Sequence, residues 1–419
     1  MKKKLTQLAQ ALAVKYPPLR VLLRGTDYLL RRTRYLLRGI AVKKEPKTIF
    51  FASFEGQSYT DSPRAIYEYC LQSPDFQDYQ FIWRLLDENN AGTLAQNPRT
   101  RVVSTERDYL RALHCAGYWV LNYRVDVGAV PRKNQVFMQC WHGTPLKRLG
   151  CDLQEISTAM NTHAEQCVKY RREARKLRYF LSPSPFASDC FCSAFDMKAL
   201  GKAHTLVETG YPRNDYLTRH TPQEVQAVKA ALGIEHETRK IILYAPTWRD
   251  DQFRAGIGYT YDLGLDFDLL REQLGREYLI LFRAHYLVRS AFDFARYADF
   301  VRDVSDYPDI GRLYPLADLL ITDYSSVFFD YAILRRPMLF YMYDLANYRD
   351  ALRGFYLDLA ELPGPVLANQ TALADAIQGL CAADWQGEKY QDFYARFNPL
   401  DDGNASQRAA KILLGDEKE

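Results

Sequence analysis

Several features that mark common protein classes are missing from this sequence of 419 residues. Its eight cysteines form no CxxC pair, and a chain of this length needs no disulfide framework, so a reducing setting fits best. No run of about 20 apolar residues occurs, so we expect no transmembrane helix. A Walker-type lysine loop, a GxGxxG fingerprint and an HExxH motif are also absent. We therefore expect no tightly bound cofactor, and nothing indicates a requirement for a soluble divalent cation.

The composition is that of a soluble globular protein, with 47% hydrophobic and 25% charged residues. The length is enough for two domains of ordinary size. The net charge of +4 is unevenly distributed, because residues 1–45 carry twelve lysines and arginines against two carboxylates, which leaves the remainder net negative. A duplex-binding enzyme would need cations spread over its body, so we expect no nucleic-acid partner.

Residues 1–45 interleave these cations with leucines at helical spacing, and Pro17 and Pro18 split the segment into two expected helices. A basic amphipathic helix suits an anionic membrane surface, where each Lys or Arg contributes about 1 kcal/mol. One alternative is a helix that packs its leucines on the protein's own core and leaves its basic face in solvent. A secretory signal fits less well, because arginines interrupt the apolar stretches. We predict that residues 1–45 attach the protein to a membrane surface.

From Pro46 onward, apolar stretches of strand length alternate with helical patterns, which predicts an α/β protein with parallel sheets. The turn residues of 210–215 break the rhythm, and it restarts at Lys240. We expect an N-terminal Rossmann-like domain over 46–215 and a second one over 216–385. Helices are expected over 386–419. Twelve strands are predicted, at 48–54, 79–85, 101–104, 118–123, 135–140, 179–182, 205–208, 241–244, 278–282, 301–304, 319–322 and 338–341.

Polar residues follow four of these strands, at the strand ends where open α/β sheets bind ligands. They are His142 with Gly143 and Thr144; residues 245–250 with Thr247; Arg283 with His285; and Asp323 with Ser325 and Ser326. The two serines can cap an expected helix over 327–334, whose free N–H groups suit a phosphate. Taken singly, a turn histidine in the core is the better explanation of the first site, and an ordinary helix cap explains the last site equally well.

Five ordered stretches together resemble a known family. They are Trp141-His142-Gly143-Thr144-Pro145-Leu146-Lys147, Gly210-Tyr211-Pro212-Arg213-Asn214-Asp215, Tyr244-Ala245-Pro246-Thr247-Trp248-Arg249, Thr322-Asp323-Tyr324-Ser325-Ser326, and the stretch from Asp344 to Tyr356. The sequence resembles the CDP-glycerol glycerophosphotransferases, the teichoic acid primases and polymerases of bacterial cell walls, over roughly residues 46–390. The resemblance implies a GT-B architecture, in which two Rossmann-like domains face each other across the site. We expect the domain over 46–215 to bind the acceptor and the domain over 216–385 to bind the CDP-alditol donor. One departure is Tyr286, where the family usually has proline.

The resemblance also implies roles for individual residues. His142 matches the family's proposed general base, and His285 matches a second essential histidine that contacts the donor phosphates. Asp323, Ser325 and Ser326 match the turn that holds the donor pyrophosphate. Further contacts to the substrate are expected from Gly143, Thr144, Arg213, Thr247, Arg283 and Arg353.

The implied reaction is attack of an acceptor hydroxyl on the β-phosphorus of CDP-glycerol, with release of CMP. The expected acceptor is a polyprenyl-diphosphate-linked saccharide at the cytoplasmic face of the bacterial membrane. The short chain with a single catalytic module favours a primase slightly over a polymerase. The alternatives are a CDP-ribitol-dependent transferase, another GT-B glycosyltransferase acting on a cell-surface glycan, and a non-catalytic binding protein.

Overall fold

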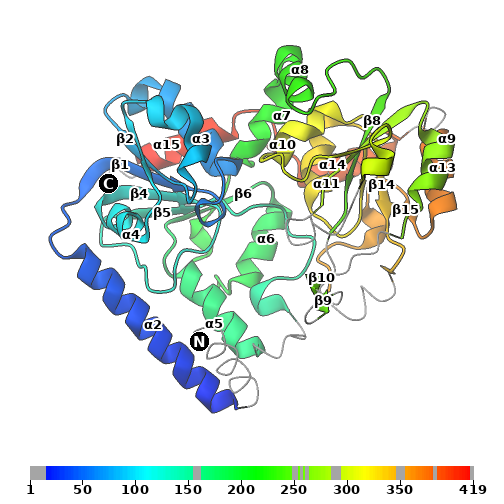
Figure 1. The fold of residues 1–419 in the computed structure, drawn as a ribbon. Coiled ribbons are helices and arrows are strands. Elements are labelled where there is room, and N and C mark those ends of the chain that lie inside the picture. Colours follow the sequence, from blue (N-terminus) through cyan, green and yellow to red (C-terminus); the bar gives the residue numbers. More distant parts are fainter. Residues whose placement is uncertain are drawn as a thin grey trace.

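Two parallel β-sheets with helices on both faces form the two halves of the molecule (Figure 1). We analysed a computed structural model, which describes residues 16–153, 162–247, 253–254, 258–259, 264–284, 294–345, 354–380 and 385–415. All strand pairs within the two sheets are parallel. This is the predicted α/β architecture of two Rossmann-like halves.

The first sheet has seven strands in the order β3-β2-β1-β4-β5-β6-β7. Its strands are β1 (Glu45–Ala52), β2 (Gln80–Arg84), β3 (Thr100–Val103), β4 (Ala116–Leu121), β5 (Val136–Gln139), β6 (Tyr179–Ser182) and β7 (Leu206–Glu208). The helices of this half are α2 (Pro17–Gly39), α3 (Asp61–Gln72), α4 (Glu106–Cys115), α5 (His163–Ala174) and α6 (Pro185–Ala194).

The second sheet has six strands in the order β12-β11-β8-β13-β14-β15. Its strands are β8 (Lys240–Ala245), β11 (Tyr278–Phe282), β12 (Val301–Asp303), β13 (Leu319–Thr322), β14 (Met338–Tyr341) and β15 (Val366–Leu367). The helices that follow β7 are α7 (Asp215–Arg219), α8 (Pro222–Ala231), α9 (Phe267–Leu274), α10 (Ile310–Leu313), α11 (Val327–Tyr331), α13 (Gln370–Gly379), α14 (Glu388–Phe397) and α15 (Ala405–Gly415). A two-stranded hairpin pairs β9 (Phe253–Arg254) with β10 (Gly258–Tyr259).

Both sheets are buried on both faces, which explains why their strands read as continuous apolar runs. In β1, Ile49 and Phe51 belong to one core cluster while Phe50 and Ala52 belong to another, because successive side chains point to opposite faces. In β8, Ile242 and Leu243 separate in the same way. Each half therefore has two cores, one on either side of its sheet.

The two sheets share one topology, counted from the first strand of each half. The strand order reverses between β1 and β4 in the first half and between β8 and β13 in the second. Ligands of open α/β sheets bind outside the carboxyl ends of the strands at such reversal points. In the first half the Phe54 N–H donates to Asn122 Oδ1 across this point (2.8 Å). In the second half Thr247 and Asp323 form the equivalent link, described below.

The C-terminal helix α15 returns to the first half, beside α3 (Figure 1). Ala409, Ala410 and Leu413 of α15 are buried in the same cluster as Ile66 and Cys70 of α3. The chain thus crosses between the halves twice, once before β8 and once before α15. The predicted domain limits at 215/216 and 385/386 stay predictions.

Most predicted elements are confirmed with shifts of one to three residues at their ends, but three differ in an informative way. Phe54 is outside β1, because its φ of 48° ends the strand. The helix expected over 157–176 begins at His163, where Thr162 and Glu165 form a capping box; residues 154–161 lie outside the described residues. The helix expected over 327–334 is α-helical only to Tyr331 and ends in a 3₁₀ turn.

Helix α2 packs its polar side against the first half. Tyr35 is buried, with its ring stacked on His114 at 3.9 Å between centroids. Arg20 and Arg24 both pair with Glu165 of α5 at 3.1 Å, and Arg31 pairs with Asp126 at 2.7 Å. The leucines on the other side are all more than half exposed: Leu22, Leu29, Leu30, Leu36 and Leu37. The alternative in which these leucines pack on the core is therefore wrong for α2. In the described part of the chain no helix is both long and apolar enough to cross a bilayer.

Candidate active site between the two halves

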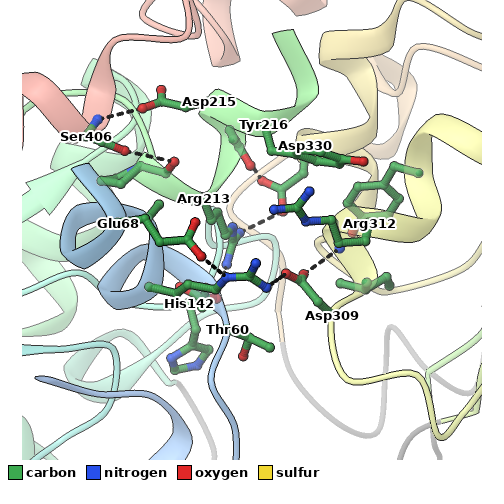
Figure 2. Close-up of a pocket in the computed structure, with 18 of the residues that line it drawn as sticks. Thr60, Glu68, His142, Arg213, Asp215, Tyr216, Asp309, Arg312, Asp330 and Ser406 are labelled. Atoms are coloured by element: carbon green, nitrogen blue, oxygen red, sulfur yellow. Dashed lines mark hydrogen bonds and ion pairs between the residues drawn. The ribbon is translucent and has the colours of Figure 1, made fainter. Parts of the chain in front are cut away.

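A cavity of about 390 Å³ lies between the two halves (Figure 2). It is lined by the end of the β5 segment, by α3 and by the 3₁₀ turn Pro212–Asn214 on one side, and by α10 and α11 on the other. Four predicted site residues line it: His142, Arg213, Arg283 and Ser326. Residues that are distant in sequence and come from both sheets therefore meet at one cavity.

The turn after β5 fixes the position of His142. Trp141 has a φ of 50°, and its N–H donates to Gln139 Oε1 at 3.0 Å, so the chain reverses direction at once. The Trp141 ring packs edge-on against Phe191 and Phe195 and forms a stack with the His142 imidazole at 4.5 Å. This packing holds the imidazole at the strand end, where its side chain is exposed to the cavity.

One hydrogen bond defines which nitrogen of His142 can act as a base. His142 Nδ1 lies 2.8 Å from the backbone carbonyl of Asn122, which can only accept. The proton of the neutral imidazole therefore resides on Nδ1, and Nε2 carries the lone pair. Burial lowers the pKa of His142 and outweighs the opposing effects of the Asn122 hydrogen bond and Asp61, while Arg213 and Arg124 lower it further. The imidazole is neutral at pH 7 and ready to take a proton.

Gly143 marks the point where the halves touch. Its φ is 153°, and a Cβ placed there would lie 2.9 Å from Ser326 Oγ of the second half. A side chain at this position would displace the Ser326 hydroxyl, and its φ is one that residues with a side chain rarely adopt, so glycine suits this position. Thr144 is buried behind the turn and does not line the cavity, so it supports the loop from within.

Arg213 joins the halves by an ion triad. Its guanidinium donates to Asp61 Oδ2 of α3 at 2.9 Å and to Asp330 Oδ2 of α11 at 2.8 Å. All three side chains are largely buried. Burial lowers the pKa of Arg213, but Asp330 and Asp61 outweigh it, so the pKa is raised. Both carboxylates depend on this one cation, and the predicted substrate contact is in this structure an internal ion-pair centre.

Thr247 and Asp323 pair with each other at the reversal point of the second sheet. Asp323 Oδ1 accepts from the N–H of Thr247 (2.8 Å), from its hydroxyl (2.7 Å) and from the Tyr324 N–H (2.6 Å). Asp323 is buried, and neither residue lines the cavity. The pair therefore fixes the loops after β8 and β13 relative to each other.

The two serines before α11 have different roles, although both were expected to cap the helix. Ser325 Oγ accepts from the Val327 N–H at 3.4 Å, whereas Ser326, at the N-cap, makes no capping hydrogen bond with its side chain. Ser326 lines the cavity instead, with its hydroxyl toward Gly143. Ser325 thus caps the helix and Ser326 is available to a ligand.

Arg283 contributes a cation to the cavity. Its Nη1 donates to the carbonyls of Val304 (3.1 Å) and Tyr307 (2.7 Å), which holds the side chain in place. Burial lowers its pKa, and it forms no ion pair with the carboxylates of the described residues. The remaining N–H groups can serve an anion. Two further predicted site residues, His285 and Arg353, lie outside the described residues.

Several charged residues of the cavity were missed by the sequence reasoning. Arg64 pairs with Glu68 at 2.8 Å and reaches Asp309 of the second half at 3.6 Å (Figure 2). Asp61 and Asp330 hold Arg213, as described. Asp330 lies in the expected helix over 327–334, but nothing local marks it or Asp61 as part of a site, because their partner Arg213 is more than 100 positions away from each. Among the described residues no group of three or more His, Cys, Asp or Glu side chains could hold a metal ion.

Comparison with known proteins agrees with this geometry. Residues 35–415 match the family described as CDP-glycerol:poly(glycerophosphate) glycerophosphotransferase. The teichoic acid poly(glycerol phosphate) polymerase of Bacillus spizizenii is 38% identical over 94% of this chain and 99% of its own length. The teichoic acid glycerol-phosphate transferase of Staphylococcus aureus is 38% identical over 87% of this chain and 92% of its own. The chain spans about half the length of the Bacillus subtilis polymerase, to which it is 38% identical.

Solved structures show the same fold. The wall teichoic acid polymerase TagF matches with a TM-score of 0.83 and 36% identity, over 95% of this chain and 97% of that chain. A UDP-GlcNAc 2-epimerase from Neisseria meningitidis matches with a TM-score of 0.54 and 12% identity, a likeness of fold alone. With the family match spanning most of its length, this chain belongs to the CDP-glycerol glycerophosphotransferase family and is a phosphotransferase of GT-B architecture.

Proposed function

We propose that this enzyme transfers glycerol phosphate from CDP-glycerol to a hydroxyl of a polyprenyl-diphosphate-linked acceptor and releases CMP. The observation that carries the proposal is His142, whose Nε2 lone pair is available at the cavity between the halves. The family indicates the class of donor. The cavity brings together a base, a cation and a hydroxyl, those of His142, Arg283 and Ser326.

The proposed reaction is a single phosphoryl transfer. His142 Nε2 takes the proton of the acceptor hydroxyl, the oxygen attacks the β-phosphorus of CDP-glycerol, and the bond from that phosphorus to the bridging oxygen of CMP breaks. Such transfers depend on positioning and on stabilising charge over the phosphate oxygens. Arg283 and Ser326 would stabilise the diphosphate, beside the N-terminal end of α11.

The remaining predicted residues receive supporting roles in this proposal. Thr247 and Asp323 position the loops under the diphosphate, since the two residues hydrogen-bond to each other. Arg213 sets the distance between the halves through Asp61 and Asp330. For His285 and Arg353, the proposal rests on the family resemblance alone. We propose no tightly bound cofactor.

Glycerol is favoured over ribitol by the relatives. The proteins named for poly(glycerol phosphate) are 38–39% identical to this chain, whereas the poly(ribitol-phosphate) polymerase of Bacillus spizizenii is 33% identical. Those named primase are 28–30% identical, which favours extension of a polymer over the priming step that the short chain suggested. A base with a defined lone pair argues against a non-catalytic binding protein.

The test is incubation with CDP-glycerol and a lipid-linked acceptor, followed by mass spectrometry. We expect CMP and an acceptor that is heavier by glycerol phosphate, with several additions for a polymerase and one for a primase. Parallel reactions with CDP-ribitol and UDP-sugars should give no product. Turnover of one of these donors alone would replace the proposed substrate.

We further propose that α2 places the enzyme on the anionic cytoplasmic face of the bacterial membrane as a peripheral protein. The five exposed leucines of α2 form an apolar side, and the exposed Arg34 and Arg38, with the other cations of 1–45, supply positive charge. An anionic bilayer satisfies both features, because leucines enter the headgroup boundary while cations contact lipid phosphates.

Replacing Leu22, Leu29 and Leu36 by glutamine should strongly reduce sedimentation with anionic vesicles. Each leucine that no longer enters the bilayer loses roughly 1.5–3 kcal/mol of favourable transfer free energy. Binding of CDP-glycerol should be unaffected, since none of the three lines the cavity between the halves. The matched control is Leu86→Gln, a half-exposed leucine distant from α2. Unchanged sedimentation of the triple variant would refute attachment through α2.

A further inference from the structure

A second and larger cavity, of about 980 Å³, lies within the first half. It is lined by α2, by α5 and by the segment that follows β4, and it does not involve the second sheet. One residue lines both cavities, and that residue is His142. A transferase needs two substrates that meet at one base, and the imidazole lies where these two cavities adjoin.

The second cavity is lined by five cations and by the carboxylates of Asp27, Glu55, Glu165 and Glu173, and two of its arginines have no carboxylate partner among the described residues. Arg124 stacks on the Tyr170 ring at 4.7 Å and forms no ion pair with any carboxylate of the described residues. Arg172 lies over the Tyr28 ring at 4.3 Å, also without such a pair. Aromatic rings hold both guanidinium groups in place while their N–H donors stay available. These arginines are thus positioned for an anionic partner that the described part of the chain does not supply.

The cations follow one another from His142 toward α2. Arg124 is close enough to His142 to lower its pKa. Burial lowers the pKa of Lys169, and the positive charges of Arg24 and Arg124 lower it further. Glu165 offsets part of this charge, but it already pairs with both Arg20 and Arg24. Like charges this close repel one another unless an anion lies between them.

We propose that this cavity binds the acceptor as an anionic phosphodiester chain, an inference that rests on the proposed function. The terminal hydroxyl reaches Nε2 of His142 and gives it the proton. The first phosphate lies on Arg124, and the following part of the chain passes Lys169 and Arg24 toward α2. The apolar side of α2 faces away from the protein at this end, where a lipid anchor would lie.

The two cavities have different linings, which suit the donor and the acceptor respectively. The cavity between the halves includes Ser326 and Arg283 of the second half, as a donor site at a GT-B interface would. Among the described residues, those that line the second cavity all belong to the first half, and the cavity adjoins the helix with the exposed leucines. The donor and the acceptor would therefore approach His142 from two different cavities.

The test uses the full-length enzyme with Arg124→Gln and Lys169→Gln, and Arg175→Gln as control. Arg175 is an exposed arginine at the end of the same helix α5, outside the cavity. Calorimetry measures the Kd of a soluble glycerol phosphate oligomer without lipid. Losing one charge-assisted phosphate contact should raise this Kd roughly tenfold in each cavity variant. The control should match the wild type, and Arg124→Lys should restore part of the affinity.

A second readout separates this inference from the proposed function. CDP-glycerol should bind to all variants as to the wild type, and the KM of the oligomer should rise without a change in the KM of CDP-glycerol. An unchanged oligomer Kd in both cavity variants overturns the acceptor site, whatever the enzyme does with CDP-glycerol. A loss of CDP-glycerol affinity in these variants overturns it as well, because the cavity would then hold the donor. If the oligomer binds as expected but CDP-glycerol is not turned over, the proposed function fails and the anion site remains.

Discussion

Replacing His142 by glutamine should reduce CMP release by roughly 10² to 10⁴, the contribution of a positioned general base. Glutamine keeps the length of the side chain and can still donate to the Asn122 carbonyl, so the turn after β5 should persist. It has no lone pair of comparable basicity where Nε2 stands, and the acceptor hydroxyl would keep its proton. The rate of CMP release under saturating CDP-glycerol measures this effect directly.

The matched control for this variant is His204→Gln, an exposed histidine of the first half that lines neither cavity. Its turnover should equal that of the wild type. Both variants should bind CDP-glycerol and unfold at the wild-type temperature. Retained turnover in His142→Gln would exclude His142 as the base.

The pH profile of the wild type gives an independent signature of the same group. Burial lowers the pKa of His142 below its ordinary value of 6.5. The base is active when neutral, so the acid limb of kcat/KM should have its midpoint below pH 6.5. A midpoint above 6.5 would mean that a different group takes the proton.

Replacing Arg213 by methionine should destabilise the protein by about 3–5 kcal/mol, because two buried carboxylates would lose their cation. Asp61 and Asp330 would remain between the halves, where burial already raises the pKa of Asp330 and Arg213 opposes that effect. The loss should appear as a lower unfolding temperature. It should shrink at low pH, since burial raises the pKa of Asp330 and its protonation removes an unpaired charge.

Two further variants separate lost pairing from a general effect of losing an arginine. Arg296→Met removes an exposed ion pair with Asp268 and should change stability by less than about 1 kcal/mol. The triple variant Asp61→Asn, Arg213→Met and Asp330→Asn should recover part of the loss, because no buried charge is left unpaired. A triple variant no more stable than Arg213→Met would contradict the triad as the source of the effect.

The position of His142 could be predicted from sequence because its signals are local. An apolar run of strand length ends two residues before the histidine, and a glycine follows it. The strand ends of a parallel sheet lie at one edge, so the pattern alone brings the ends of β5 and β13 toward ligand-binding positions. The observed contact of Gly143 with Ser326 agrees with this reasoning.

The role of Arg213 could not be predicted in the same way. Its partners, Asp61 and Asp330, are 152 and 117 positions away, and each is an unremarkable carboxylate in its own segment. A substrate contact is the simpler reading of an arginine in a turn, and only the fold shows that two carboxylates occupy its guanidinium. The same limit applies to Thr247 and Asp323, which bind each other at the reversal point of the second sheet.

The orientation of α2 is a third case. Leucines and arginines at helical spacing define two sides of a helix but not which side faces the protein. The polar side of α2 packs against the first half because its arginines form ion pairs with Glu165 and Asp126, and because Tyr35 is buried in the core. Those acceptors lie in later segments of the sequence. Only the tertiary structure therefore shows which side of α2 faces the protein.

The most direct test of the central claim, that His142 stands between a donor and an acceptor cavity, is a crystal structure of His142→Gln with CDP-glycerol. The diphosphate is predicted in the cavity between the halves, beside Ser326 and Arg283, with the β-phosphorus next to the replaced side chain. A nucleotide bound in the cavity lined by Arg124 and Lys169, or away from residue 142 altogether, would contradict the account.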